Sequence, residues 1–123
     1  MRIEWSEVPV LPGMRTGSTR QGVAGEKLSV VRVIAAADSS FKESALHTHG
    51  NEQLLIVQSG SLELEVDGER YWVRAGDLAV FPIGSVHGAV GVGNEGAEYY
   101  EIFSPPRYDQ LPGYFGSSPL QFA

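Results

Sequence analysis

The sequence predicts an all-β fold in which short strands of a single domain close into a β-barrel or β-sandwich. No window of about twelve residues shows the apolar periodicity of an amphipathic helix. Short apolar or alternating runs instead recur between Gly, Pro and Asp, at least six of them along the chain. Short strands at this spacing, with turn residues between them, are typical of a sandwich or a barrel.

The first expected strands differ in pattern. Residues 28–37 are rich in Val and Ile, which favours a strand because β-branched side chains pack well on a pleated surface. Residues 53–58 form a short apolar run, and residues 61–66 alternate apolar with polar side chains. Ser59 and Gly60 separate these two runs, so we expect two strands there.

Asp67 and Gly68 have the composition of a two-residue hairpin turn of the primed type. Such a turn would place the following residues opposite one another: Glu65 with Arg70, Leu64 with Tyr71, and Leu62 with Val73. Apolar side chains would then meet on one face and opposite charges on the other, which supports the hairpin.

The rest of the chain continues the pattern. Residues 75–77 predict another turn, and the further expected strands are residues 78–82, 85–90 and 97–103. The tail, residues 105–123, is rich in Pro, Gly and aromatic residues, and we expect an ordered, irregular strap over the barrel. The chain is thus expected to be one domain, residues 1–123, with its core at about 26–104.

The composition of the chain excludes several classes of function. Nine basic and fifteen acidic residues give a net charge of −6, which argues against nucleic acids and anionic membranes as partners. No apolar run approaches the roughly 20 residues of a membrane span, and residues 1–5 do not open a signal peptide. The absence of cysteine excludes disulfides and thiolate ligands. These observations favour a cytoplasmic protein that acts on a small molecule.

All three histidines stand where one metal site would need them. His47 and His49 are two apart, which places both imidazoles on one face of a strand. Gln53 follows by another even step, and His87 would come from a distant strand. Such a nitrogen and oxygen set suits one divalent ion of Zn, Ni, Co, Mn or Fe, without choosing among them.

Gln53 has two possible roles. Its amide oxygen could be the fourth ligand, or its side chain could hydrogen-bond a ligated histidine. As a ligand, a neutral amide would leave the ion its full positive charge, which strengthens its hold on anionic oxygens and its Lewis acidity.

The last expected strand adds candidate catalytic residues. Glu101 and Phe103 are two apart and therefore share a face, and Arg107 lies just beyond the strand. If that face is interior, a carboxylate and an aromatic ring border the metal pocket. The alternative is an ion pair between Glu101 and Arg107 at the rim.

Two stretches resemble the motifs of the cupin superfamily. They read His47-x-His49, three residues, Gln53, six residues, Gly60, and then Gly76, five residues, Pro82-x-Gly84, two residues, His87. The resemblance implies a jelly-roll barrel that binds a metal through the histidines. The usual ligand glutamate is Gln53 here, and Glu52 is its nearby competitor.

A narrower resemblance is to the KdgF-type cupins of pectin and alginate breakdown. It rests on the His-x-His pair, Glu52-Gln53 and the ending Phe103-Ser104-Pro105-Pro106-Arg107-x-Asp109. Those proteins are metal-dependent and convert 4,5-unsaturated monouronates into the linear ketonised acid. The resemblance implies these ligands and catalytic residues: His47, His49, Gln53 and His87 for the metal, and Glu101, Phe103 and Arg107 for catalysis. The family more often has aspartate at the position of Glu101.

We therefore expect a non-redox isomerisation or ketonisation of a small anionic sugar acid or hydroxy-keto acid. Glu101 would move the proton, Arg107 would hold the carboxylate, and Phe103 would pack on the carbon skeleton. Two alternatives remain, an Fe(II)- or Ni-dependent dioxygenase and a ligand-binding cupin without catalysis. A homodimer is expected, through residues 1–10, the aromatic tail or Trp72 on the outer face.

Overall fold

The computed structural model describes residues 1–40, 45–116 and 118–123. In these parts of the chain the secondary structure is almost entirely strand. The elements are η1 (Trp5–Glu7), β1 (Leu11–Pro12), β2 (Thr16–Ala24), β3 (Ser29–Ser40), β4 (His47–Thr48), β5 (Glu52–Val66), β6 (Glu69–Arg74), β7 (Leu78–Phe81), β8 (His87–Ser104), η2 (Tyr108–Gln110) and β9 (Gln121–Phe122).

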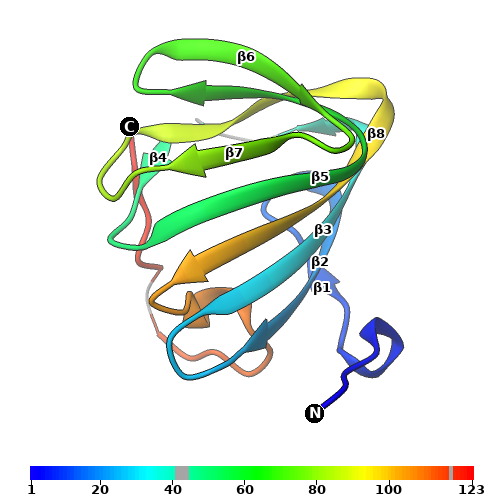
Figure 1. The fold of residues 1–123 in the computed structure, drawn as a ribbon, viewed down its shortest axis with the longest axis vertical. Helices are drawn as coiled ribbons and strands as arrows, with labels where there is room; N and C mark the ends of the chain where they lie inside the picture. The colour runs from blue at the N-terminus through cyan, green and yellow to red at the C-terminus, as the bar shows by residue number, and fades with distance from the viewer. Residues whose placement is uncertain (41–44, 117) are drawn as a thin grey trace.

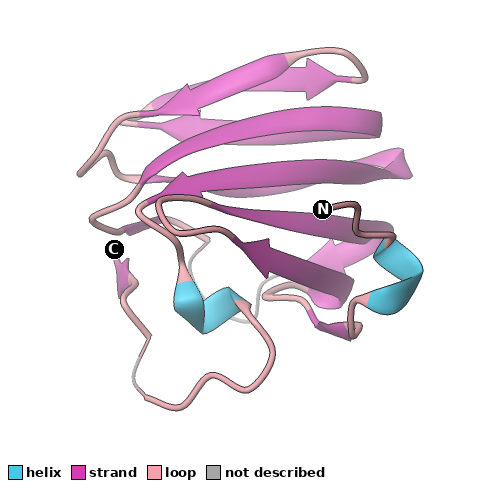
Figure 2. Ribbon diagram, turned by 60° about the horizontal axis from the view of Figure 1, so that its bottom comes forward, coloured by secondary structure: helices cyan, strands magenta, loops and turns pink. Residues whose placement is uncertain are grey.

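All strand pairs are antiparallel and belong to one nine-stranded sheet, which curls on itself (Figure 1). One path through it runs β1-β2-β3-β8-β4-β9, and β5 pairs with β6, β7 and β8. The expected all-β barrel or sandwich is confirmed. Figure 2 shows the two short helices outside the strands and the tail after β8 running mostly as loops toward the C-terminus.

β5 and β8 are long strands that bend, where the sequence predicts two shorter strands in each place. Residues 53–58 and 61–66 both lie in β5, and residues 85–90 and 97–103 lie largely in β8. The two strands stay paired through register shifts near Gly60 instead of breaking into loops. A side chain at Gly60 would collide with the carbonyl oxygen of Gly96, and both glycines have positive φ. The bulges let one strand serve both halves of the barrel, which explains why a turn signal appears inside a strand.

The predicted hairpin is confirmed in its register. β5 and β6 pair Glu65 with Arg70, and the same register places Leu64 opposite Tyr71 and Leu62 opposite Val73. Asp67 and Gly68 both have positive φ, as the primed turn requires. Trp72 lies on the outer face and is 45% exposed, so it remains available for the expected dimer contact, which stays a prediction.

β2 is a strand that the sequence analysis did not predict. Its residues, Thr-Gly-Ser-Thr-Arg-Gln-Gly-Val-Ala, show no alternation of apolar side chains. The reason is that its inward face borders a polar cavity, to which Ser18 and Arg20 contribute. Gln21 points the other way and donates to the carbonyl oxygens of Trp5 and Val8, which holds the N-terminal segment on the outer surface of its own chain.

The apolar core lies in the barrel interior and borders the cavity, and several of its members also line the cavity. Its buried members are Val31, Val33, Ala35, Leu55, Val57, Leu62, Leu64, Val73, Ala79, Phe81, Ala97, Tyr99 and Phe103. The tail is partly regular, because β9 adds to β4 and pairs Phe122 with His47. Among the described residues there is no helix with the length and apolar character needed to cross a membrane.

Candidate metal centre

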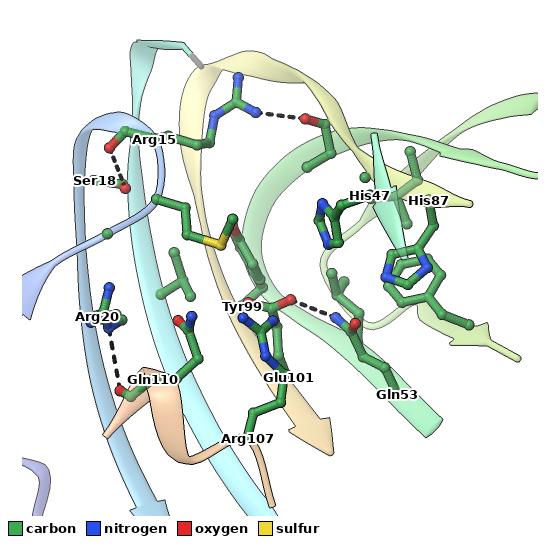
Figure 3. A pocket seen from close by; sticks show the side chains of 18 residues that line it. Arg15, Ser18, Arg20, His47, Gln53, His87, Tyr99, Glu101, Arg107 and Gln110 are labelled. Atoms are coloured by element: carbon green, nitrogen blue, oxygen red, sulfur yellow. Dashed lines mark hydrogen bonds between the residues drawn. The ribbon is translucent and has the colours of Figure 1, made fainter. Parts of the chain in front are cut away.

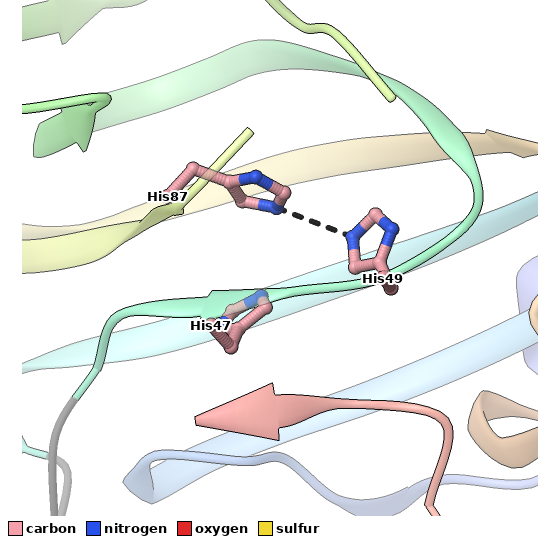
Figure 4. Close-up of side chains that lie close together, drawn as sticks. All are labelled: His47, His49 and His87. Atoms are coloured by element: carbon pink, nitrogen blue, oxygen red, sulfur yellow. Dashed lines mark hydrogen bonds between the residues drawn. The ribbon is translucent and has the colours of Figure 1, made fainter. Parts of the chain in front are cut away.

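The three histidines converge inside the barrel. His47 lies in β4 directly opposite His87, the first residue of β8, and His49 follows β4 by one residue. All three are buried, and one nitrogen from each lies within 4.8 Å of the others. Figure 4 shows the three rings close together, with His47 and His49 on one segment and His87 on another. The grouping expected from the spacing is therefore present in the structure.

Backbone carbonyls fix the tautomer of each ring. The Nδ1 atom of His47 lies 2.9 Å from the Ala45 oxygen, and Nδ1 of His49 lies 3.1 Å from the Asn51 oxygen. Nδ1 of His87 is 3.1 Å from the oxygen of its neighbour Ser85. A carbonyl only accepts, so each Nδ1 carries the proton and donates it. Each Nε2 then presents a lone pair, which is the arrangement that orients metal-binding imidazoles in proteins.

The distance between two of these lone pairs fits a shared ion. Nε2 of His49 lies 3.2 Å from Nε2 of His87, the pair joined by the dashed line in Figure 4. Two unprotonated nitrogens repel each other at this distance, because neither can donate a hydrogen bond. Ligands of a zinc ion lie about 2.0–2.1 Å from the metal, and at a tetrahedral angle they are roughly 3.3 Å apart. The geometry thus fits a metal ion between the rings.

Burial keeps the rings in the ligating form. It lowers the pKa of His47 to about 4 and that of His87 to about 3, and in both cases the loss of solvation is the largest cause. Burial also lowers the pKa of His49. Neutral imidazoles are the form that binds metal, so all three are ready to coordinate at neutral pH.

Gln53 extends the cluster by an oxygen. It is 2% exposed, and its Oε1 lies 3.0 Å from Nε2 of His49. Its amide nitrogen donates to Oε2 of Glu101, which determines that the oxygen faces the histidines. Oε1 of Gln53 and Nε2 of His49 are both acceptors, so they face each other as two ligands of one cation do. Glu52, the competing candidate, is exposed and points away from the cluster.

Substitution Gln53→Glu tests the role of this oxygen. We expect metal binding to be kept or tightened, because a carboxylate replaces a neutral amide. Affinity for small carboxylates should fall, since the ion loses one unit of charge and a second carboxylate stands beside Glu101. Calorimetry with zinc and then with glycolate measures both, and Glu52→Gln is the matched control. Unchanged glycolate affinity with intact metal binding would place Gln53 outside the ligand set.

A cavity lies beside the cluster, lined by side chains from several segments (Figure 3). His47, Gln53 and His87 line one end of it. The polar residues along the remaining wall are Arg15, Ser18, Arg20, Tyr99, Glu101, Arg107 and Gln110. Apolar side chains, Leu55 and Phe81 among them, complete the lining. Such a cavity suits a small molecule with several oxygen atoms.

Glu101 lies in this cavity, on the interior face of β8. Figure 3 shows its hydrogen bond to Gln53, which links the carboxylate to the metal centre. Burial raises its pKa above the ordinary value, although the charge of Arg107 and the amide of Gln53 act in the opposite direction. A carboxyl group whose pKa is raised in this way is closer to the condition for exchanging protons near neutral pH.

Arg107 is held by a carboxylate other than the one considered in the sequence analysis. Nε and Nη2 of its guanidinium donate to the two carboxylate oxygens of Asp109, at 3.2 and 2.7 Å. The Asp109 side chain is buried, which acts to raise its pKa, but the bonds from Arg107 outweigh this and lower the pKa below its ordinary value. The alternative expected from the sequence was an ion pair between Arg107 and Glu101 at the rim. Arg107 instead forms an ion pair with Asp109, two residues further along the tail. Within the described residues Nη1 of Arg107 has no hydrogen bond, and Arg107 lines the cavity.

Phe103 is buried more deeply than the sequence analysis expected. It is 0% exposed and is not part of the cavity wall. Its ring packs edge-on against His49, and the Arg107 guanidinium carbon lies 4.9 Å from the ring centre. A contact between Phe103 and substrate stays a prediction. In the structure, Phe103 contacts the candidate ligand His49 and the guanidinium of Arg107.

Several residues that line the cavity were not predicted from the sequence, chiefly Arg15, Ser18 and Arg20 near β2 and Gln110 in η2. No signal could have found the β2 residues, because their strand lacks an apolar pattern. Tyr99 could have been predicted as a cavity residue, because it stands two residues before Glu101 and therefore on the same face of the strand.

The family model of the cupin domain matches residues 37–103, which is more than half of the chain. The chain belongs to the cupin family. Within it, the chain resembles KdgF. It is 33% identical over 66 residues to the pectin degradation protein KdgF of Dickeya dadantii, an alignment that covers 53% of this chain and 59% of that protein. The chain thus matches less than two thirds of the length of this curated relative.

Solved structures agree with this placement. KdgF from a Halomonas species is 30% identical, with a TM-score of 0.66, and the match covers 86% of this chain and 95% of the other. An RmlC-like cupin from Shewanella frigidimarina is 28% identical, with a TM-score of 0.67 and coverage of 85% and 89%. The polyketide cyclase RemF of Streptomyces resistomycificus, 16% identical with a TM-score of 0.70, shares the fold.

Proposed function

We propose that this cupin is a metal-dependent enzyme that ketonises a small sugar acid, such as a 4,5-unsaturated monouronate, by proton transfer without redox chemistry. The observation that carries the proposal is the series of contacts from His49 through Gln53 to Glu101: the Gln53 oxygen lies 3.0 Å from Nε2 of His49, and the Gln53 amide nitrogen donates to Glu101. This series would set a carboxylate that can exchange protons beside a bound metal ion, inside one cavity. The similarity to the pectin degradation protein KdgF supports a uronate as substrate.

His47, His49 and His87, with the oxygen of Gln53, would hold a divalent ion. When bound, the ion would supply Lewis acidity toward a substrate oxygen. Because all four ligands are neutral, an anionic substrate would be drawn strongly to this end of the cavity. The carbonyl contacts at Nδ1 keep the rings oriented for this role.

Arg107 would bind the substrate carboxylate. Asp109 occupies two of its donors and fixes the plane of the guanidinium, while the remaining N–H groups face the cavity. A planar, fixed guanidinium suits a carboxylate. The pair is buried, since the two side chains are 3% and 8% exposed, so little water competes for these donors.

Glu101 would move the proton. Ketonisation of a 4,5-unsaturated monouronate breaks the bond between the ring oxygen and the anomeric carbon. One proton leaves the anomeric hydroxyl and one is added to carbon 4, so no water and no electrons are exchanged overall. A single carboxyl group between these two positions can perform both transfers. The hydrogen bond from Gln53 holds one oxygen of Glu101 and leaves the other directed to substrate.

The assay that tests the proposal follows the ultraviolet absorbance of an unsaturated monouronate. Metal-loaded protein should remove the absorbance equally fast with and without oxygen, and with Zn as well as with redox-active metals. Turnover that stops without oxygen would support the dioxygenase alternative. Tight uronate binding without turnover would support a ligand-binding cupin.

A further inference from the structure

Tyr99 places a hydroxyl group in the cavity that the protein does not satisfy. The side chain is 5% exposed and forms part of the cavity wall, next to Glu101 in Figure 3. Among the residues that the structure describes, no hydrogen bond or ion pair is made by its hydroxyl. In the described part of the chain the fully enclosed polar side-chain atom without a partner is Arg32 Nε, so the Tyr99 hydroxyl keeps access to the cavity and can bond a ligand there.

The residues paired with Tyr99 on the neighbouring strands offer its hydroxyl no hydrogen-bond partner. On β8 it is flanked by Val33 of β3 and Val57 of β5, both apolar and buried. Burial raises its pKa, so the phenol keeps its proton and can donate it in a hydrogen bond. A phenylalanine would fill the same space without leaving a polar group unpaired, so packing alone does not require the hydroxyl.

The position of Tyr99 relative to the metal centre identifies what it can bind. Glu101 is bonded to Gln53, and Tyr99 is two residues further from it along the strand, about 6.6 Å away. Arg15, which also lines the cavity, is held by donation to Ser39 and to the carbonyl of Ala89. Beyond Glu101, the cavity wall thus offers a hydroxyl donor to an oxygen-rich group.

We propose that the Tyr99 hydroxyl hydrogen-bonds a hydroxyl group at the end of the substrate remote from its carboxylate, and thereby selects polyhydroxylated acids over short hydroxy acids. This inference rests on the proposed function, because it takes the carboxylate to lie near the metal and Arg107. Tyr99 acts in it as a specificity-determining residue that binds substrate and takes no part in the proton transfer.

The variant Tyr99→Phe removes this hydroxyl and keeps the ring. Calorimetry on zinc-loaded protein would use two non-reacting probes, glucuronate and glycolate, of which only the first has the remote hydroxyls. We expect glucuronate to bind about 3- to 10-fold more weakly to the variant, while glycolate affinity is unchanged. Tyr100→Phe is the matched control, because Tyr100 lies on the opposite face and stacks on Trp5. It should change neither affinity.

Thermal unfolding separates a binding role from a structural one. Metal-loaded Tyr99→Phe should unfold at the same temperature as wild type or higher, since an unpaired hydroxyl has been removed. A lower unfolding temperature, or equal glucuronate affinity in wild type and variant, would overturn the inference. Both readouts are independent of turnover. A failed uronate assay with a selective loss of glucuronate binding would therefore contradict the proposed reaction and leave this inference standing.

Discussion

Substitution His49→Ala is expected to abolish the metal centre. Wild-type protein should carry about one divalent ion per chain, and the variant almost none. Loss of groups that only orient a ligand already costs roughly 10–100-fold in metal affinity, and loss of a ligand should cost more. His49 stands between the other partners, because its Nε2 faces both His87 and Gln53. Elemental analysis of both proteins after dialysis against zinc measures the difference.

Stability gives a second readout for this variant. Zinc at 100 times its dissociation constant should stabilise wild type by about 2.7 kcal/mol, and the variant should gain nothing. Without zinc, the alanine leaves a gap beside Phe103 but removes the repulsion between His49 and His87, so a folded variant is expected. Glu52→Gln, an exposed change one residue before Gln53, should behave as wild type. Equal zinc content and equal zinc stabilisation in His49→Ala would contradict the site as described.

Substitution Glu101→Gln is expected to lower kcat by about 10²–10⁴-fold, the usual contribution of a general acid or base. The new side chain has the same length and can present its oxygen to the Gln53 amide, so the hydrogen bond is kept. It cannot take up or deliver a proton near neutral pH. Metal content and glucuronate affinity should therefore change little, and the loss should appear in kcat.

Two further variants sharpen this test. Glu98→Gln removes a carboxylate from the outer face of the same strand, where it pairs with Arg32, and should leave kcat unchanged. Glu101→Asp shortens the side chain by about 1.5 Å. It should keep part of the activity, since the carboxylate remains but loses its contact with Gln53. Full activity in Glu101→Gln would remove the proton-transfer role from this residue.

The sequence alone determined the fold class, the hairpin register and the grouping of the histidines. Each depends on local patterns. Alternation defines a buried face, Asp67-Gly68 defines a turn and therefore a register, and an even spacing places His47 and His49 together. Such patterns can be recognised in the sequence because each involves residues that are close together along the chain.

Only the tertiary structure decided the partners of the polar side chains. It assigned Arg107 to Asp109 instead of Glu101, moved Phe103 from the cavity wall into the core, and turned Gln53 toward the cluster and Glu52 to solvent. It also added Tyr99 and the polar strand β2 to the cavity. A hydrogen-bond partner depends on which segments meet in space. Which segments meet depends on how the long strands β5 and β8 bend at their bulges. Packing across the barrel sets that bend, and the local sequence pattern does not show it.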